Sequence, residues 1–128
     1  MKQVHLTGSE WHVMTCLWEE SPQMLMQLVD KLSARVGWAK STTITTLRRM
    51  EEKQLVCITR TDKGKSYTPN VAQEDAVHSE TRSFLDRVYH GSVGLMISAM
   101  AQRRELSSEE LAELREILRK AEEQHEDG

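Results

Sequence analysis

Apolar residues recur every three or four positions along most of the chain, and this spacing predicts a mostly helical protein. A first helix is expected to begin after Thr7 and Glu10, whose hydroxyl and carboxylate are three residues apart as a capping box requires. Ser21-Pro22 should end it, because the residue before a proline disfavours the helical conformation. A second helix is expected over residues 25–36, closed by Gly37 in a left-handed conformation.

A third helix is predicted from the hydroxyl-rich segment after Trp38 to about Lys53. A helical wheel places four residues on the side that should face the core, namely Thr43, Leu47, Met50 and Gln54. The opposite side holds hydroxyl and guanidinium groups, from Ser41, Thr45 and Arg48, with Thr42 and Arg49 on its flanks. Threonine is a poor helix former, so the four threonines within residues 42–46 indicate a surface selected for something other than helix stability.

After this helix the period of the pattern shortens toward two. Residues 55–60 are rich in β-branched side chains, residues 61–65 have turn chemistry, and residues 66–68 form a second short run before Pro69. This segment is predicted to be a β-hairpin with a basic tip.

Helical spacing then returns in three segments. They are expected to begin at a capping pair of Asn70 and Gln73, at about Val93, and at a capping box of Ser107 and Glu110. Three helices followed by a hairpin are the element order of a winged helix-turn-helix. We therefore predict a mostly α fold with a small β-hairpin: a winged-helix DNA-binding domain over residues 1–70 and a three-helix dimerisation domain over residues 71–128.

The formal net charge of −3 by itself argues against nucleic-acid binding, but the charge is unevenly distributed. Residues 71–128 carry seven basic and thirteen acidic residues, whereas residues 31–65 carry nine basic and three acidic ones. Lys, Arg, Ser and Thr side chains supply phosphate contacts, and threonine offers bases both a hydroxyl and a methyl group. The predicted DNA-binding residues are Lys40, Ser41, Thr42, Thr45, Thr46, Arg48, Arg49, Arg60, Lys63 and Lys65.

The carboxyl-terminal segment has more apolar surface than about 55 residues can bury unaided. Formation of a homodimer would bury it, and two recognition helices about 34–36 Å apart could then contact two half-sites of one operator. The alternative is that these helices fold back on the winged domain of the same chain. The predicted dimerisation residues are Phe84, Leu85, Val88, Val93, Met96, Ile97, Met100, Leu111, Leu114, Ile117 and Leu118.

Composition and motifs exclude several other classes of protein. With 38% hydrophobic and 29% charged residues the chain is globular, and it contains no apolar run of the ~20 residues that span a bilayer. The first residues do not resemble a signal peptide, so a cytoplasmic location is expected. Cys16 and Cys57 are isolated and are expected to be small buried residues. His12 and Cys16 alone do not make a metal site, and no enzymatic constellation or cofactor motif is present.

Three stretches of the sequence are similar to those of a known family: residues 6–18 (LTGSEWHVMTCLW), Trp38 with residues 42–53 (TTITTLRRMEEK), and residues 64–69 (GKSYTP). The similarity continues through residues 84–91 and 106–118. The chain resembles the penicillinase-repressor family of the BlaI, MecI and CopY type. The resemblance implies a bacterial repressor with an amino-terminal winged helix and a helical dimerisation region, which binds a palindromic operator.

The sequence departs from the family at three places. Gln54 stands where the family has glycine, so the turn after the third helix is expected to lack its left-handed residue. The Asn-Phe bond that a membrane-bound sensor protease cleaves in penicillin-responsive members aligns with Ala99-Met100, and the motif is not kept. The carboxyl-terminal CxC motifs of copper-responsive members are missing, which excludes a thiolate copper switch of that kind.

These observations predict a homodimeric transcriptional repressor that binds double-stranded operator DNA. The alternative is a winged-helix protein-interaction module without DNA binding. A sensor protease acting at Ala99 and Met100 is a further possible partner, which rests on the aligned position alone.

Overall fold

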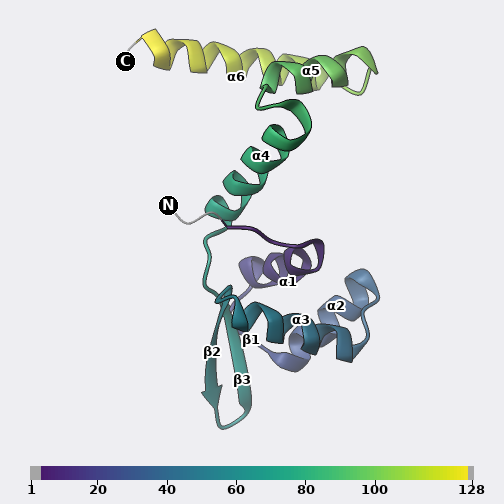
Figure 1. Ribbon diagram of the computed structural model, residues 1–128, viewed down its shortest axis with the longest axis vertical. Coiled ribbons are helices and arrows are strands. Elements are labelled where there is room, and N and C mark those ends of the chain that lie inside the picture. Colours follow the sequence, from purple (N-terminus) through teal and green to yellow (C-terminus); the bar gives the residue numbers. More distant parts are fainter. Residues whose placement is uncertain (1–3, 127–128) are drawn as a thin grey trace. The chain divides into compact units, whose positions relative to one another are not determined.

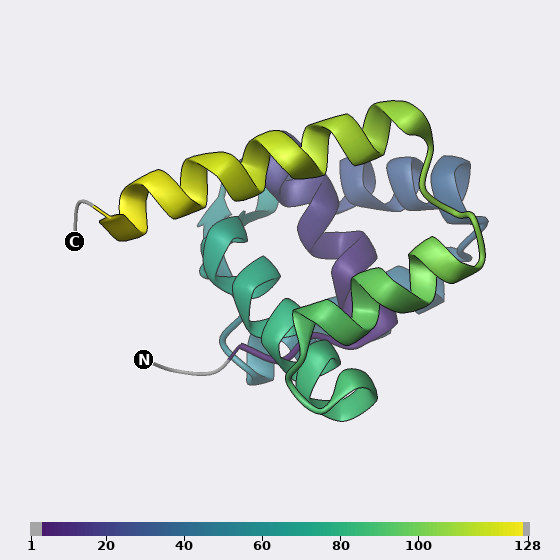
Figure 2. The same ribbon diagram turned by 90° about the horizontal axis from the view of Figure 1, so that it is seen from above.

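The computed structural model describes residues 4–126 and contains two compact units, Met1–Arg82 and Ser83–Gly128. The first unit has the element order of a winged helix: α1 (Gly8–Glu19), β1 (Gln23–Met24), α2 (Leu25–Val36), α3 (Lys40–Glu52), β2 (Val56–Thr61), β3 (Gly64–Pro69) and the start of α4 (Gln73–Tyr89) (Figure 1). The second unit holds the end of α4, α5 (Val93–Gln102) and α6 (Ser108–Glu126) (Figure 2). The predicted mostly α fold with a β-hairpin is confirmed.

The core of the first unit is formed where α1, α2 and α3 meet the sheet. Its buried side chains include Val13, Met14, Cys16 and Leu17 from α1, Leu28 and Leu32 from α2, Leu47 and Met50 from α3, and Tyr67 from β3. Cys57 lies on the outward face of β2 and is exposed, so the expectation of a buried residue is right for Cys16 and wrong for Cys57.

The antiparallel sheet has the strand order β1-β3-β2. The short strand β1 was not expected, and it pairs Gln23 with Tyr67 across the sheet. The buried Gln23 amide donates hydrogen bonds to the carbonyl oxygens of Cys16 (2.8 Å) and Glu20 (2.6 Å). The Glu20 carbonyl lies past the end of α1 and has no partner within the helix, whereas the Cys16 carbonyl also accepts from the Glu20 N–H (3.2 Å). The two bonds from Gln23 fix β1 to the end of α1.

The start of α1 is held by the predicted capping box. The Thr7 N–H donates to the Glu10 carboxylate (2.8 Å), and the Glu10 N–H donates to the Thr7 hydroxyl (3.3 Å). The same carboxylate is buried and accepts from Lys53 Nζ at the end of α3 (2.8 Å). Burial would raise the pKa of Glu10, but the hydrogen bonds from Lys53 and Thr7 outweigh it, so this pKa lies below its ordinary value.

The end of α3 differs from the expectation. Gln54 itself adopts the left-handed conformation, with φ 62°, so the turn does have its left-handed residue although it lacks the glycine. The Leu55 N–H donates to the carbonyl of Met50 (2.9 Å), as in a glycine-terminated helix. The Asn70 side-chain amide donates to the Gln54 carbonyl (2.9 Å). Because α4 begins at Gln73, the residue before the helix is Ala72, and Asn70 is not at the capping position that was predicted for it.

The second unit begins its helices at side-chain caps. The Ser92 hydroxyl accepts from the Leu95 N–H (3.1 Å), and Ser107 and Glu110 form the capping box predicted for α6. Within the described residues, no helix combines the length and apolarity needed to cross a membrane.

The Glu10–Lys53 ion pair predicts a pH-dependent stability. Replacing Lys53 by Met leaves a buried carboxylate without its cation and should lower the free energy of unfolding at pH 7 by about 1–2 kcal/mol. A carboxylate with a lowered folded-state pKa stabilises the fold above the ordinary value of 4.5 and loses that contribution as the pH falls through the lowered value. The difference between wild type and Lys53→Met should therefore shrink below pH 4.5 in denaturant titrations.

The matched control is Lys31→Met, which breaks an ion pair with the exposed Glu20. Exposed pairs contribute little, so this change should lower the free energy of unfolding less than Lys53→Met does and vary less with pH. Equal losses in the two variants at pH 7 would contradict the role assigned to Glu10.

The conformation of Gln54 gives a second stability prediction. A residue with a Cβ atom is strained at a positive φ, whereas glycine is not, so Gln54→Gly should raise the free energy of unfolding by about 1 kcal/mol. Gln54→Ala keeps the Cβ atom and should stay near wild type. Destabilisation by Gln54→Gly, as glycine causes at most other positions, would show that the turn carries no strain.

Candidate nucleic-acid interface

One face of α3 is fully available to a partner. The six predicted DNA-binding residues on it other than Thr46 are all exposed, namely Lys40, Ser41, Thr42, Thr45, Arg48 and Arg49. The opposite face is anchored in the core by Thr43, Leu47 and Met50. Gln54 does not continue that buried face as the helical wheel suggested, because α3 ends at Glu52 and Gln54 lies exposed in the following turn.

Thr46 does not belong to the exposed face. Its side chain is only 7% exposed, and its hydroxyl donates to the carbonyl of Thr42 one turn earlier (2.8 Å). A threonine hydroxyl that bonds back to its own helix and faces the core cannot contact a base, so we remove Thr46 from the predicted interface.

The start of α3 is held by packing. Ala39 is the N-cap and has no side-chain oxygen, so the hydroxyls of Ser41 and Thr42 take no part in capping. The Trp38 ring packs against the core and contacts the edge of His12 on α1, with ring centroids 5.9 Å apart. The hydroxyl groups of this first turn therefore face outward on a helix whose position is fixed by aromatic contacts.

The wing is a tight hairpin with basic side chains at its end. The Thr61 hydroxyl donates to the Gly64 carbonyl (2.9 Å) and accepts from the Lys63 N–H (3.2 Å), which closes the turn. Gly64 has φ 120°, a conformation that side chains with a Cβ atom rarely adopt. Arg60, Lys63 and Lys65 are all exposed, as predicted for phosphate contacts.

Two of these cations lie directly opposite each other. Arg60 pairs with Lys65 across β2 and β3, and alternation along the strands puts both on the face that carries Ile58 and Tyr67 against the core. Like charges directly opposite in a sheet are destabilising by a few tenths of a kcal/mol. An anion bound between them would remove that repulsion.

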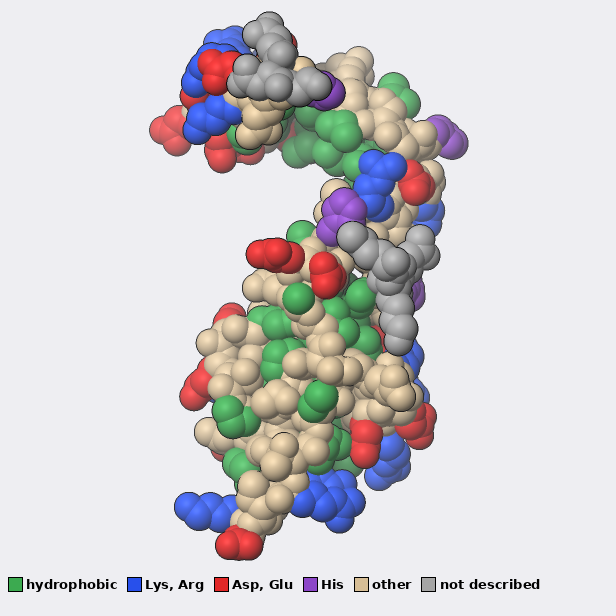
Figure 3. All heavy atoms as spheres, turned by 90° about the vertical axis from the view of Figure 1, so that its left-hand side faces the viewer, with side chains coloured by type: hydrophobic (Ala, Val, Ile, Leu, Met, Phe, Trp, Pro, Cys, Tyr) green, Lys and Arg blue, Asp and Glu red, His purple; other side chains and the backbone are tan. Residues whose placement is uncertain are grey.

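Ion pairing separates the nine cations of residues 31–65 into two groups. Three of them are neutralised inside the unit: Lys31 by Glu20 (2.7 Å), Arg35 by Glu19 (2.7 Å) and Lys53 by Glu10 (2.8 Å). The other six are those predicted to bind DNA, and none forms an ion pair with another residue between 4 and 126. Figure 3 shows basic side chains on both sides of the hairpin tip.

Glu52 is an exposed residue of the same face that the sequence analysis did not include. It follows Arg48 by four positions and Thr45 by seven, so it lies on the stripe that carries both. A helical wheel of the sequence places Glu52 beside Thr45 and Arg48, but an acidic residue does not fit the basic and hydroxyl pattern expected of a phosphate-binding face.

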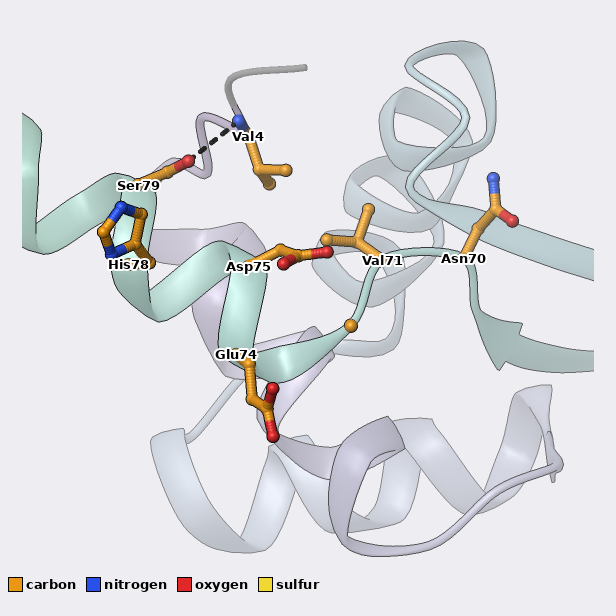
Figure 4. Close-up of a pocket in the computed structure, with 8 residues that line it drawn as sticks. Val4, Asn70, Val71, Glu74, Asp75, His78 and Ser79 are labelled. Atoms are coloured by element: carbon orange, nitrogen blue, oxygen red, sulfur yellow. Dashed lines mark hydrogen bonds between the residues drawn. The ribbon is translucent and has the colours of Figure 1, made fainter. Parts of the chain in front are cut away.

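A separate hollow of about 510 Å³ lies between the amino-terminal segment and the start of α4 (Figure 4). Glu74, Asp75 and His78 line it, and the Val4 N–H donates to the Ser79 hydroxyl at its rim (3.2 Å). Its carboxylates would repel phosphates, so it is not part of a nucleic-acid interface. In the part of the chain that the structure covers, no three His, Cys, Asp or Glu side chains are grouped to hold a metal ion.

The predicted dimerisation residues form apolar surface on the second unit. Leu85 is buried, and the Phe84 ring contacts Tyr89 with centroids 5.9 Å apart. Met96, Ile97, Met100 and Leu114 are half-buried, whereas Phe84, Val88, Val93, Leu111, Ile117 and Leu118 are 39% to 56% exposed. A single chain thus leaves most of these side chains at least partly in contact with water.

Comparison with known proteins finds similarity along nearly the whole chain. Residues 6–120 match the family described as penicillinase repressor. The penicillinase repressor of Bacillus licheniformis is 29% identical over 119 residues, which cover 92% of this chain and 93% of that protein. The methicillin resistance regulatory protein MecI of Staphylococcus aureus (strain N315) is 24% identical over 119 residues, with 93% and 97% covered.

Two solved structures are similar to part of the chain. The solution structure of the DNA binding domain of the repressor BlaI has a TM-score of 0.53 and 26% identity, and the match covers 58% of this chain and 90% of that one. The monomeric form of Bacillus licheniformis BlaI in complex with the blaP half-operator has a TM-score of 0.52, with the same identity and coverage.

Proposed function

Because the chain belongs to the penicillinase repressor family, we propose that it is a transcriptional repressor that binds a palindromic operator as a homodimer. The six cations of α3 and the wing that have no ion partner among the described residues are the observation that carries this proposal. Three of these cations lie on α3, the helix that also carries the exposed hydroxyls of Ser41, Thr42 and Thr45. The similarity to a repressor domain solved on its half-operator supports the same assignment.

The roles of the residues follow from their chemistry. Lys40, Arg48, Arg49, Arg60, Lys63 and Lys65 would neutralise phosphates and release counterions, which supplies most of the affinity. The hydroxyls of Ser41, Thr42 and Thr45 are short and lie on the first turns of α3, where they would reach base edges in the major groove. Sequence preference is therefore assigned to the hydroxyls and affinity to the cations.

A second copy of the chain is the proposed partner of the second unit. Several apolar side chains of α5 and α6 are exposed in a single chain, among them Val93, Ile117 and Leu118. Helix α6 also repeats Leu111, Leu114 and Leu118 at spacings of three and four. This spacing is typical of helices that pack against a partner helix. The acidic balance of residues 71–128 would keep this unit away from DNA.

Release by proteolysis is a narrower hypothesis. The bond aligned with the family's cleavage site joins Ala99 to Met100 inside α5, and both side chains are half-buried. A membrane-bound sensor protease would therefore have to act on a locally unwound α5. Operator DNA and a second copy remain the partners that the side chains support most directly.

Substitutions of the two residue classes test the DNA-binding proposal. Lys65→Ala or Arg49→Ala should weaken binding to all duplexes alike and reduce the slope of log K against log salt concentration by about 1, because each removes a phosphate contact. Thr45→Ala should leave the slope unchanged and alter the preferred sequence. Fluorescence anisotropy over a range of salt concentrations measures both effects.

Lys31→Ala serves as the control, since this cation is already paired with Glu20 and should change neither slope nor preference. A wild-type protein whose DNA affinity does not vary with salt, or that co-purifies with a partner protein and ignores DNA at low salt, would favour the protein-interaction module instead.

The dimer is tested by a charge placed on the apolar face of α6. Leu118→Asp should convert a wild-type dimer into a monomer of 14.7 kDa, because a carboxylate cannot be buried in an apolar interface without a partner. Lys120→Asp introduces the same side chain about 200° around the helix on its polar face and should leave the dimer intact. Light scattering after size exclusion gives the masses, and a monomeric wild type at micromolar concentration would refute the dimer.

A further inference from the structure

A single stripe runs along the exposed face of α3. We refer to it as the recognition stripe, and its members are Ser41, Thr45, Arg48 and Glu52. They are spaced four, three and four positions apart, and this spacing keeps them on one side of the helix. At about 1.5 Å per residue the recognition stripe is about 16 Å long, which corresponds to roughly five base pairs. Three of its residues have the chemistry expected of a DNA contact, and Glu52 has the opposite charge.

Glu52 differs in its ion pairing from the acidic residues that stabilise the first unit. Glu10, Glu19 and Glu20 each pair with a cation at 2.7–2.8 Å, whereas Glu52 is exposed and forms no ion pair with another described residue. Arg48 is one turn away, but an arginine four positions before a glutamate is the less favourable order for a helical ion pair. The Glu52 carboxylate therefore does not stabilise the fold through an ion pair between described residues.

The neighbouring Glu51 provides a contrast on the same helix. Burial raises the pKa of Tyr67 on β3, and the charge of the exposed Glu51 carboxylate adds to that rise. Adjacent residues are about 100° apart on a helix, and this turn moves Glu51 off the recognition stripe. The two carboxylates have the same charge but lie on different sides of α3.

A carboxylate on a DNA-facing surface has one good partner among the bases. An ionised carboxylate only accepts hydrogen bonds. In the major groove, cytosine presents the N4 amino group as a donor, adenine presents a donor beside the N7 acceptor, and guanine and thymine present acceptors. Against phosphates the same carboxylate is repulsive, so it weakens any contact that lacks the matching donor.

We infer that Glu52 is a specificity-determining residue that accepts a hydrogen bond from N4 of a cytosine in each operator half-site and disfavours duplexes without it. The inference rests on the proposed function, because it needs α3 to lie in the major groove. It extends the sequence-selective surface of α3 from the hydroxyls of the first turns to the last turn of the helix.

The experiment compares full-length wild type, Glu52→Gln and Glu51→Gln on a pool of double-stranded DNA with a randomised core. Selection and sequencing give the preferred base at each position, and anisotropy gives the affinities for the preferred duplex and for a scrambled one. Circular dichroism checks that all three proteins have the same helical content.

Wild type should select cytosine at one position of each half-site. Glutamine pairs with adenine through N6 and N7, so Glu52→Gln should shift that one position to adenine and leave the others unchanged. Loss of the repulsive charge should also raise affinity for the scrambled duplex, and the ratio of preferred to scrambled affinity for the wild-type sequence should fall about tenfold. Glu51→Gln should keep the wild-type preference at every position.

Two results would overturn the inference in distinguishable ways. If wild type selects a sequence and Glu52→Gln selects the same one, Glu52 does not determine specificity although the protein binds DNA. If wild type selects no sequence and its binding to the pool does not depend on salt, the proposed function fails and this inference fails with it.

Discussion

The buried carboxylate of Glu10 is the contact on which the geometry of the winged helix most depends. One of its oxygens accepts from the Thr7 N–H at the start of α1, and the other accepts from Lys53 at the end of α3. Because a buried carboxylate without partners costs several kcal/mol, the two helix ends cannot separate without exposing it or leaving it unpaired. Helix α3, the proposed DNA-binding helix, is thereby fixed at the end opposite to the hydroxyl-bearing turns.

The segment that follows β3 makes further hydrogen bonds to the same end of α3. Asn70 donates its side-chain amide to the Gln54 carbonyl and its backbone N–H to the Leu55 carbonyl, both at 2.9 Å. Trp18 on α1 donates its indole N–H to the carbonyl of Val71 (2.9 Å). Strain at Gln54 persists because these surrounding bonds determine the turn regardless of which residue occupies it.

Much of the fold was predictable because its signals are local. The capping box of Thr7 and Glu10 and the hairpin over residues 56–69 each depend on residues close in sequence. The strand β1 was missed because it has two residues and exists only through pairing with β3. The wheel for α3 separated core from surface correctly except for Gln54, which lies beyond the end of the helix. Thr46 was included in the predicted interface for its hydroxyl, although it lies within about 60° of Thr43 and Met50 on the same wheel and is buried with them.

The ion pairing was beyond sequence reasoning for a different reason. The sequence separates Lys65 from Lys53 only by position, since Lys65 lies in the predicted hairpin and Lys53 at the end of the third helix, and it does not identify a partner for Lys53. The distinction comes from the fold, which brings Lys53 within 2.8 Å of a glutamate 43 positions earlier and leaves Lys65 opposite another cation. Pairing of this kind needs tertiary structure, and it gives the physical reason why three of the nine basic residues, Lys31, Arg35 and Lys53, are not available to a partner.

A monomer with this surface would be a poor regulator, and the proposed dimer would give the apolar second unit a physical purpose. The recognition stripe spans roughly five base pairs, and a site that short recurs far too often in a genome to be found by one copy. Joining two copies adds the base contacts of two half-sites and makes the second contact intramolecular, so affinity and selectivity both rise without any new side chain. On this reasoning the short threonine-rich face of α3 is sufficient to select an operator only in a protein that binds DNA as a dimer.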